Sequence, residues 1–193
     1  MKMRFIEIGL LDLLSSFTAL CLIVSVYCIV YRDDASLFPR ARYVNITVSG
    51  ASMEPTLHNG GVYPAVIVDE CPEIKRGSIV ACPFDILKDR LSMDDAEASK
   101  YGSLFVKRVI GLPNDRLYYD EAACALYING KKYAEPYIMD EEYDWGIGIV
   151  AVPEDCVFLM GDNRKASVDS RDIGCVPISG IVRVIDDDNT PDK

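Results

Sequence analysis

The chain has 193 residues, of which 50% are hydrophobic and 26% charged, which is enough to bury one good core with a small second lobe. Its formal net charge is -10. Nucleic-acid binding relies on clustered Lys and Arg, so this acidic balance excludes DNA and RNA as partners.

Residues 13–31 form an apolar run without a charge. As a helix this run would span roughly 28 Å and match the bilayer core. The rival interpretation is a cleavable signal peptide with Lys2 and Arg4 as its basic start. The run is too long for that, Arg32-Asp33-Asp34 follows directly, and no Ala-x-Ala site is present. The pattern predicts an uncleaved transmembrane anchor after a short tail of residues 1–12.

Basic residues lie on both sides of this run. The positive-inside rule counts those close to a span, and here they are Lys2 and Arg4 before it and Arg32, Arg40 and Arg42 after it. Charge alone therefore leaves the topology open.

The chain after a linker at 32–43 is typical of β-structure, since short runs rich in Val, Ile and Tyr are punctuated by Gly and Pro. Asn129-Gly130 predicts a type I′ hairpin, whereas the polar residues 88–100 indicate a helical or flexible insertion. We predict a mostly β catalytic domain at 44–185 with an antiparallel sheet, an inserted β-hairpin cap region at about 116–153, and an acidic tail at 186–193. Strands are expected at 44–49, 62–68, 78–84, 103–110, 116–119, 125–128, 131–134, 149–152, 157–160 and 180–185.

Two of the seven cysteines fall within the apolar run. The other five are an odd number without a Cys-x-x-Cys pair, and the chain has a single histidine, so we expect no metal site. Free thiols are expected, and the spacing leaves one disulfide open among Cys71, Cys82, Cys124, Cys156 and Cys175.

Residues 48–57 (VSGASMEPTL) join an apolar strand to a turn, with a hydroxyl at the junction. Gly50 allows unusual backbone dihedrals and Pro55 fixes the exit path. We interpret Ser52 as a nucleophile; a strand that simply ends in a Gly/Pro turn is the alternative. His58 is close enough in sequence to act as a base, but a solvated turn histidine is the stronger interpretation.

Lys107 is the better candidate for a base. Strand alternation places Phe105, Lys107 and Val109 on one face and Arg108 on the other. Apolar neighbours remove solvation from the amine and lower its pKa, which makes a general base near neutral pH. A lysine that protects a strand edge against aggregation is an equal alternative from the strand alone.

A third stretch, residues 161–171, begins with the ordinary turn sequence Gly-Asp-Asn. If the segment is extended, Ser167, Asp169 and Arg171 share one face. Asp169 and Arg171 can then pair and brace the loop, and the Ser167 hydroxyl can orient an amine. The alternative is a surface ion pair worth under about 1 kcal/mol.

These stretches together resemble the bacterial type I signal peptidases (leader peptidases), serine proteases that use a lysine base. The motifs occur in the family's order and cover nearly the whole chain: SGASMEPTL at 49–57, KRGSIV at 75–80, FVKRVIGLPND at 105–115, and residues 161–171. The resemblance implies that Ser52 is the nucleophile, Lys107 the general base and Ser167 a hydroxyl that positions the lysine. Asp169 and Arg171 would be the supporting pair.

The chain departs from the family's pattern at three places. Ser78 and Asn114 stand where the family often has Asp and Gly. Some members carry a serine hydroxyl two residues before the nucleophile to assist the oxyanion hole. Gly50 has none, so the hole is expected to use backbone N–H groups, chiefly that of Ser52.

The resemblance also implies a function: a membrane-anchored serine endopeptidase that removes signal peptides from exported preproteins at Ala-x-Ala-like sites. No cofactor or metal is expected. The implied partners are signal peptides and membrane lipid, with the secretion translocon nearby, and the implied location is the cell membrane, single-pass, with an extracytoplasmic catalytic domain. The expected substrate pockets are shallow and apolar, with core packing as the alternative for each lining residue: Ile46, Val48, Met53, Leu57, Phe105 and Val106.

Two rival functions remain open from the sequence. One is a Ser-Lys self-cleaving protease of the repressor type, which shares the β-fold but is cytosolic and carries a DNA-binding domain. The other is a non-catalytic, membrane-anchored β-domain that binds signal peptides. The presence of Ser52, Lys107 and Ser167 together favours a protease over the second.

Overall fold

The computed structural model describes residues 43–68, 74–98, 102–140 and 143–185. The predicted anchor at 13–31 and the acidic tail lie outside these ranges. Within them, no helix is long and apolar enough to span a bilayer.

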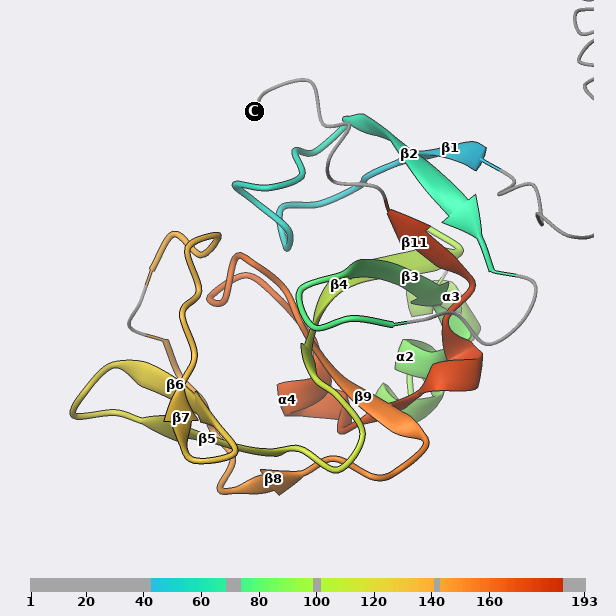
Figure 1. Ribbon diagram of the computed structural model, residues 1–193. Coiled ribbons are helices and arrows are strands. Elements are labelled where there is room, and N and C mark those ends of the chain that lie inside the picture. Colours follow the sequence, from blue (N-terminus) through green and yellow to red (C-terminus); the bar gives the residue numbers. More distant parts are fainter. Residues whose placement is uncertain (1–42, 69–73, 99–101, 141–142, 186–193) are drawn as a thin grey trace, which may run out of the picture. The chain divides into compact units, whose positions relative to one another are not determined.

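The larger of two sheets has seven strands, and every recorded pairing is antiparallel (Figure 1). Its order is β1 (Tyr43–Thr47), β2 (Val62–Ile67), β11 (Arg183–Ile185), β3 (Ile79–Pro83), β4 (Leu104–Gly111), β9 (Cys156–Met160) and β10 (Val176–Pro177). The expectation of a mostly β, antiparallel fold is confirmed.

A second sheet of four antiparallel strands is built from the chain between β4 and β9. Its order is β7 (Lys131–Lys132), β6 (Ala125–Ile128), β5 (Arg116–Asp120) and β8 (Val150–Ala151). Asn129 and Gly130 both have positive φ, +52° and +76°, and link paired residues Ile128 and Lys131. Positive φ at both central positions is the geometry of a type I′ turn, as predicted.

The core has three clusters of buried side chains, and β4 contributes to all of them. Phe105 and Val109 enter the first, Ile110 the second, and Val106 packs against the third. Lys107 and Arg108 lie between these positions, at the centre of the strand. The polar residues of β4 are therefore surrounded by apolar packing.

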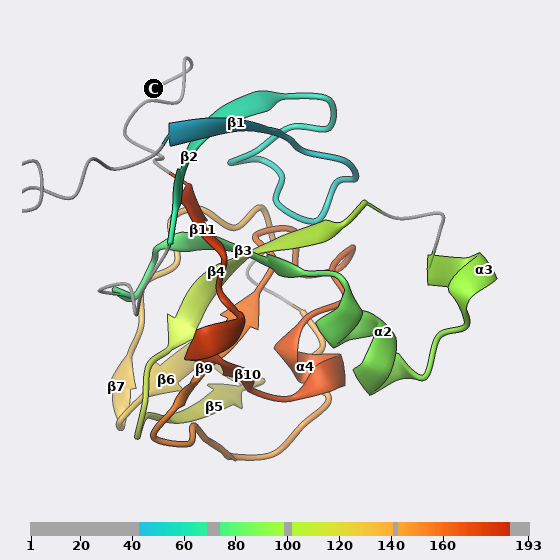
Figure 2. The same cartoon turned by 90° about the vertical axis from the view of Figure 1, so that its right-hand side faces the viewer.

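Helices appear where the sequence predicted an insertion and also where it predicted none. The expected insertion at 88–100 holds α3 (Asp95–Ala98) and the end of α2 (Asp85–Leu91), which begins before it, while α4 (Ser170–Ile173) and the 3₁₀ turn η1 (Ile178–Gly180) were not expected. Figure 2 shows α2 beside α4, where Arg90 Nη1 donates to the Ile173 carbonyl at 3.0 Å.

Candidate active site

Ser52 and Lys107, which are 55 residues apart in sequence, meet in the fold. Lys107 Nζ lies 2.9 Å from Ser52 Oγ and also donates to the Val106 carbonyl at 3.0 Å. Ser52 lies in the turn after β1 and is partly exposed, whereas Lys107 is 4% exposed. A hydroxyl accessible to a substrate is thus in contact with a buried amine.

Burial changes the protonation of that amine. Loss of solvation lowers the pKa of Lys107 from 10.5 to about 8, although the nearby Asp169 and Asp162 carboxylates and the Cys82 thiol act in the opposite direction. A lysine with a pKa of about 8 is neutral in a useful fraction of molecules near neutral pH. The amine can therefore accept a proton from the hydroxyl beside it.

The 161–171 loop packs directly on the backbone of Ser52. The Asn163 N–H donates to the Ser52 carbonyl at 3.1 Å. A Cβ added to Gly161 would lie 2.4 Å from that same carbonyl oxygen and 2.3 Å from Ser167 Oγ. Only glycine allows this close approach.

Ser167 Oγ is buried and has no hydrogen-bond partner within the described residues. The expected hydrogen bond to Lys107 is therefore not formed in this structure. The hydroxyl nevertheless lies beside Gly161, on the loop that contacts Ser52. An unpaired buried hydroxyl is uncommon, and a functional role is one of its explanations.

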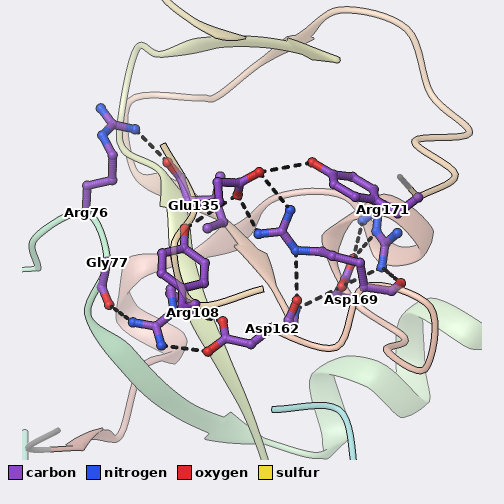
Figure 3. Close-up of polar contacts among 12 residues, drawn as sticks. Arg76, Gly77, Arg108, Glu135, Asp162, Asp169 and Arg171 are labelled. Carbon is purple, nitrogen blue, oxygen red and sulfur yellow. Dashed lines mark hydrogen bonds and ion pairs between the residues drawn. The ribbon is translucent and has the colours of Figure 1, made fainter. Parts of the chain in front are cut away.

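Asp169 and Arg171 are paired, as expected, but in a different setting. Arg171 Nε lies 2.9 Å from Asp169 Oδ1, with side chains 10% and 0% exposed, so the pair is buried and not on the surface. Asp169 itself has an extended backbone (φ -153°, ψ -159°), but the extended segment does not continue to Arg171, because Asp169 is the N-cap of α4 and forms a capping box with Asp172. Figure 3 shows the two side chains facing each other.

A buried network around Arg108 was missed by the sequence analysis. Arg108 Nε and Nη2 donate to the two carboxylate oxygens of Asp162 at 2.8 and 2.6 Å, and its Nη1 donates to the Gly77 carbonyl at 2.7 Å (Figure 3). Thr56 Oγ1 donates to Asp162 at 2.5 Å, and the guanidinium lies over the Tyr137 ring. The network joins the turn that holds Ser52 and Thr56 to β4 and to the 161–171 loop.

The signal for this network was present but ambiguous. Asp162 stands in Gly-Asp-Asn, which ordinary turn chemistry explains equally well. Arg108 was placed correctly on the opposite face from Lys107, but alternation does not say whether that face is solvated or buried.

Five of the six expected substrate residues gather in one place. Val48, Met53 and Leu57 are buried in the third cluster, and Ile46 and Val106 pack against it. Phe105 is not among them, because it packs in the first cluster.

Gly50 has φ +94°, and its N–H donates to Asn59 Oδ1 at 2.9 Å. His58 is exposed, and its backbone N–H donates to the Tyr63 hydroxyl at 2.8 Å.

The cysteines within the described ranges are all free: Cys82, Cys124, Cys156 and Cys175. Cys71 lies outside those ranges. In the same part of the chain no cluster of His, Cys, Asp and Glu is suited to hold a metal ion.

Comparison with known proteins identifies the family. The family described as signal peptidase, peptidase S26, matches residues 16–186. This chain belongs to that family. As a member of peptidase family S26, it is a serine endopeptidase of the signal peptidase type.

A curated signal peptidase I gives the same assignment, and two further proteins are similar to parts of this chain. A signal peptidase I of Bacillus caldolyticus is 32% identical over 88% of this chain and 85% of that relative. One from Bacillus licheniformis is 38% identical over 64% of this chain, which spans 63% of that relative. A crystal structure of a signal peptidase I from Enterococcus faecalis matches 61% of this chain and 100% of that chain at 26% identity, with a TM-score of 0.45.

Proposed function

We propose that this signal peptidase family member is a membrane-anchored endopeptidase that removes signal peptides from exported preproteins at Ala-x-Ala-like sites, with Ser52 as nucleophile and Lys107 as general base. The observation that carries the proposal is the 2.9 Å contact between Ser52 Oγ and a Lys107 amine that is almost fully buried. The anchor is assigned to residues 13–31 from their hydropathy.

The reaction is acyl transfer. Neutral Lys107 takes the proton from Ser52 as the serine oxygen attacks the carbonyl before the scissile bond. The resulting ammonium gives this proton to the departing amine, which becomes the new N-terminus of the mature protein. Lys107 then takes a proton from a water as that water attacks the carbonyl carbon of the acyl-Ser52 ester. The bond from this carbon to Ser52 Oγ breaks, Lys107 returns the proton to Ser52 Oγ, and the signal peptide leaves with a new C-terminal carboxyl group, which ionises in water.

The oxyanion that forms in each step needs hydrogen-bond donors. The Ser52 N–H makes no hydrogen bond to another described residue. Gly50 has no side chain to contribute, which supports a hole built mainly from backbone N–H groups.

The substrate would bind as an extended strand. β1 is the terminal strand of the larger sheet, so no strand among the described residues pairs with its outer edge. Residues 104–107 of β4 pair with β3, whereas the register with β9 begins only at Arg108. Both segments therefore offer backbone groups for strand addition. In this proposal the partly buried side chains of Ile46 and Val106 contact the small side chains of the bound Ala-x-Ala site.

One assay tests this function and separates it from its rivals. The purified protein is incubated with a peptide that carries an Ala-x-Ala site, and the products are mapped by mass spectrometry. We expect one cut after the second alanine, and a loss of about 10²–10⁴-fold in Lys107→Met, because methionine keeps the bulk and removes the amine. Lys131→Met, at an exposed position in β7, is the matched control.

Ser52→Ala is the matching test of the nucleophile and should abolish the cut. No cut by the parent would favour the non-catalytic binding domain. Cleavage within this chain alone would favour the repressor type, and parental activity in Lys107→Met or Ser52→Ala would overturn the assigned dyad.

A further inference from the structure

Another buried ion pair joins the 161–171 loop to the loop between β7 and β8 (described residues 133–140 and 143–149). Arg164 Nη2 and Nη1 lie 2.5 and 3.1 Å from the two carboxylate oxygens of Glu135. The side chains are 0% and 6% exposed. A buried pair of this kind contributes little net stability compared with apolar residues of the same volume, but it does fix geometry.

The Glu135–Arg164 pair fixes the position of the Gly161 peptide. The Nε of Arg164 donates to the Gly161 carbonyl at 2.9 Å, and on the other side the Gly161 N–H donates to Asp169 Oδ2 at 3.0 Å. Gly161 is the residue that packs against the Ser52 carbonyl and Ser167 Oγ. A displacement of this peptide would therefore move the backbone of the nucleophile.

Two further residues of the β7–β8 loop contact the arginines of the 161–171 loop. The Tyr143 hydroxyl donates to Glu135 Oε2 at 3.3 Å, and its ring lies 4.8 Å from the Arg164 guanidinium carbon. Arg171 Nη1 donates to the Asp144 carbonyl at 2.9 Å.

We propose that Glu135 is a positioning residue of the second sheet: through Arg164 it holds the Gly161 peptide against Ser52, so the chemical step depends on a loop that does not touch the reacting atoms. This inference rests on the proposed function. It assigns to Glu135 and Arg164 an effect on turnover and not on substrate binding.

The kinetic test compares Glu135→Gln with two other variants. We expect Glu135→Gln to lower kcat about 10- to 100-fold with KM nearly unchanged, since small misplacements of reacting groups have effects of this size. The kcat of Arg164→Lys should fall by a similar factor, because a single ammonium cannot bind the Glu135 carboxylate and the Gly161 carbonyl at the same time. Asp140→Asn is the matched control: it breaks the Lys165–Asp140 pair between the same two loops, which is 3.3 Å long but 58% and 51% exposed, and should leave kcat unchanged.

A readout that needs no substrate separates positioning from simple stability. Loosening of Gly161 admits water beside Lys107 and should raise its pKa from about 8 toward 10.5. The charged or titratable groups around the amine are Asp162, Asp169 and Cys82, and the two carboxylates are paired with arginines. Loss of the Glu135 charge by itself would not raise this pKa, because removal of a negative charge favours the neutral amine.

The pKa of Lys107 is measured by NMR titration of protein labelled at lysine Cε, with the signal assigned from Lys107→Met. An upward shift in Glu135→Gln, absent in Asp140→Asn, supports the inference even if no peptide is cleaved. Parental kcat and parental pKa in folded Glu135→Gln overturn it. If Glu135→Gln fails to fold, Tyr143→Phe replaces it in the test, because this substitution removes only the hydroxyl that is bonded to Glu135. A loss of about 3-fold in kcat supports the inference. An unchanged kcat contradicts it.

Discussion

The pKa of Lys107 is lowered because of the side chains that bury its amine. Its neighbours on the same face, Phe105 and Val109, are buried in one cluster, and Val106 packs against another. Alternation along the strand predicted these apolar neighbours, and with them the lowered pKa. The contact with Ser52 could not be predicted from spacing, because 55 residues separate the two and only the fold brings them together.

Ser167 provides a residue-scale test in which stability and activity should diverge. Its hydroxyl is buried and unpaired, so Ser167→Ala should leave the free energy of unfolding unchanged or raise it by up to about 1 kcal/mol. If the hydroxyl orients the Lys107 amine during the reaction, the same variant should lose at least about 10-fold in kcat/KM. Urea denaturation and peptide cleavage measure the two quantities, and a variant with parental activity would remove Ser167 from the mechanism.

The Arg108–Asp162 pair makes the opposite prediction, a loss of stability. Both side chains are almost fully buried, so Asp162→Asn leaves an uncompensated guanidinium inside the protein. We expect the free energy of unfolding to fall by about 3–5 kcal/mol, measured by chemical denaturation. A decrease below about 1 kcal/mol would contradict this prediction, because the pair would then contribute no more than an exposed ion pair.

At the scale of elements, most strands were predicted because their residues carry a local signal, whereas the two-residue strand β10 was not, and β11 begins at Arg183 and not at residue 180. Each signal lies within a few consecutive residues: the alternation of Val, Ile and Tyr in the strands, and the Asn129-Gly130 dipeptide in the hairpin. α4 was missed because four residues carry little helical periodicity. Its start depends on Asp169 as the N-cap; the extended conformation expected for this segment holds at Asp169 but ends there, where the helix begins.

The N-cap predicts how α4 responds to substitution. Asp169→Ala removes the capping hydrogen bonds, worth about 1 kcal/mol, and leaves Arg171 without its carboxylate. We expect a total loss of at least about 2 kcal/mol in the free energy of unfolding. Asp172→Ala removes only the exposed partner of the capping box and should cost less than about 1 kcal/mol; equal losses in the two variants would contradict this account.

At the scale of the whole molecule, strand order could not be predicted from the sequence. β11, the last described strand, lies between β2 and β3 and pairs with both. Ser52 lies in the connection between β1 and β2, and Lys107 lies in β4, which pairs with β3. β11 therefore joins the two parts of the sheet that hold these residues. Such long-range pairing depends on the packing of distant segments and leaves no local signal.

This topology predicts the outcome of two truncations. A chain that ends at residue 185 keeps β11 and should retain full activity. A chain that ends at residue 181 loses β11, and we expect it to lose cooperative unfolding and activity together, as measured by thermal denaturation and peptide cleavage. A cooperative, active protein without β11 would show that the sheet does not need this strand.

The pH dependence of kcat/KM on an Ala-x-Ala peptide without titrating side chains tests the central claim, a neutral Lys107 as the base, most directly. The pKa of Lys107 is lowered to about 8, and the amine must be neutral to accept the proton. Activity should therefore rise with pH through an apparent pKa of about 8 and be about 100-fold lower at pH 6 than on the alkaline plateau. Activity that stays level from pH 9 down to pH 6 would contradict a lysine base.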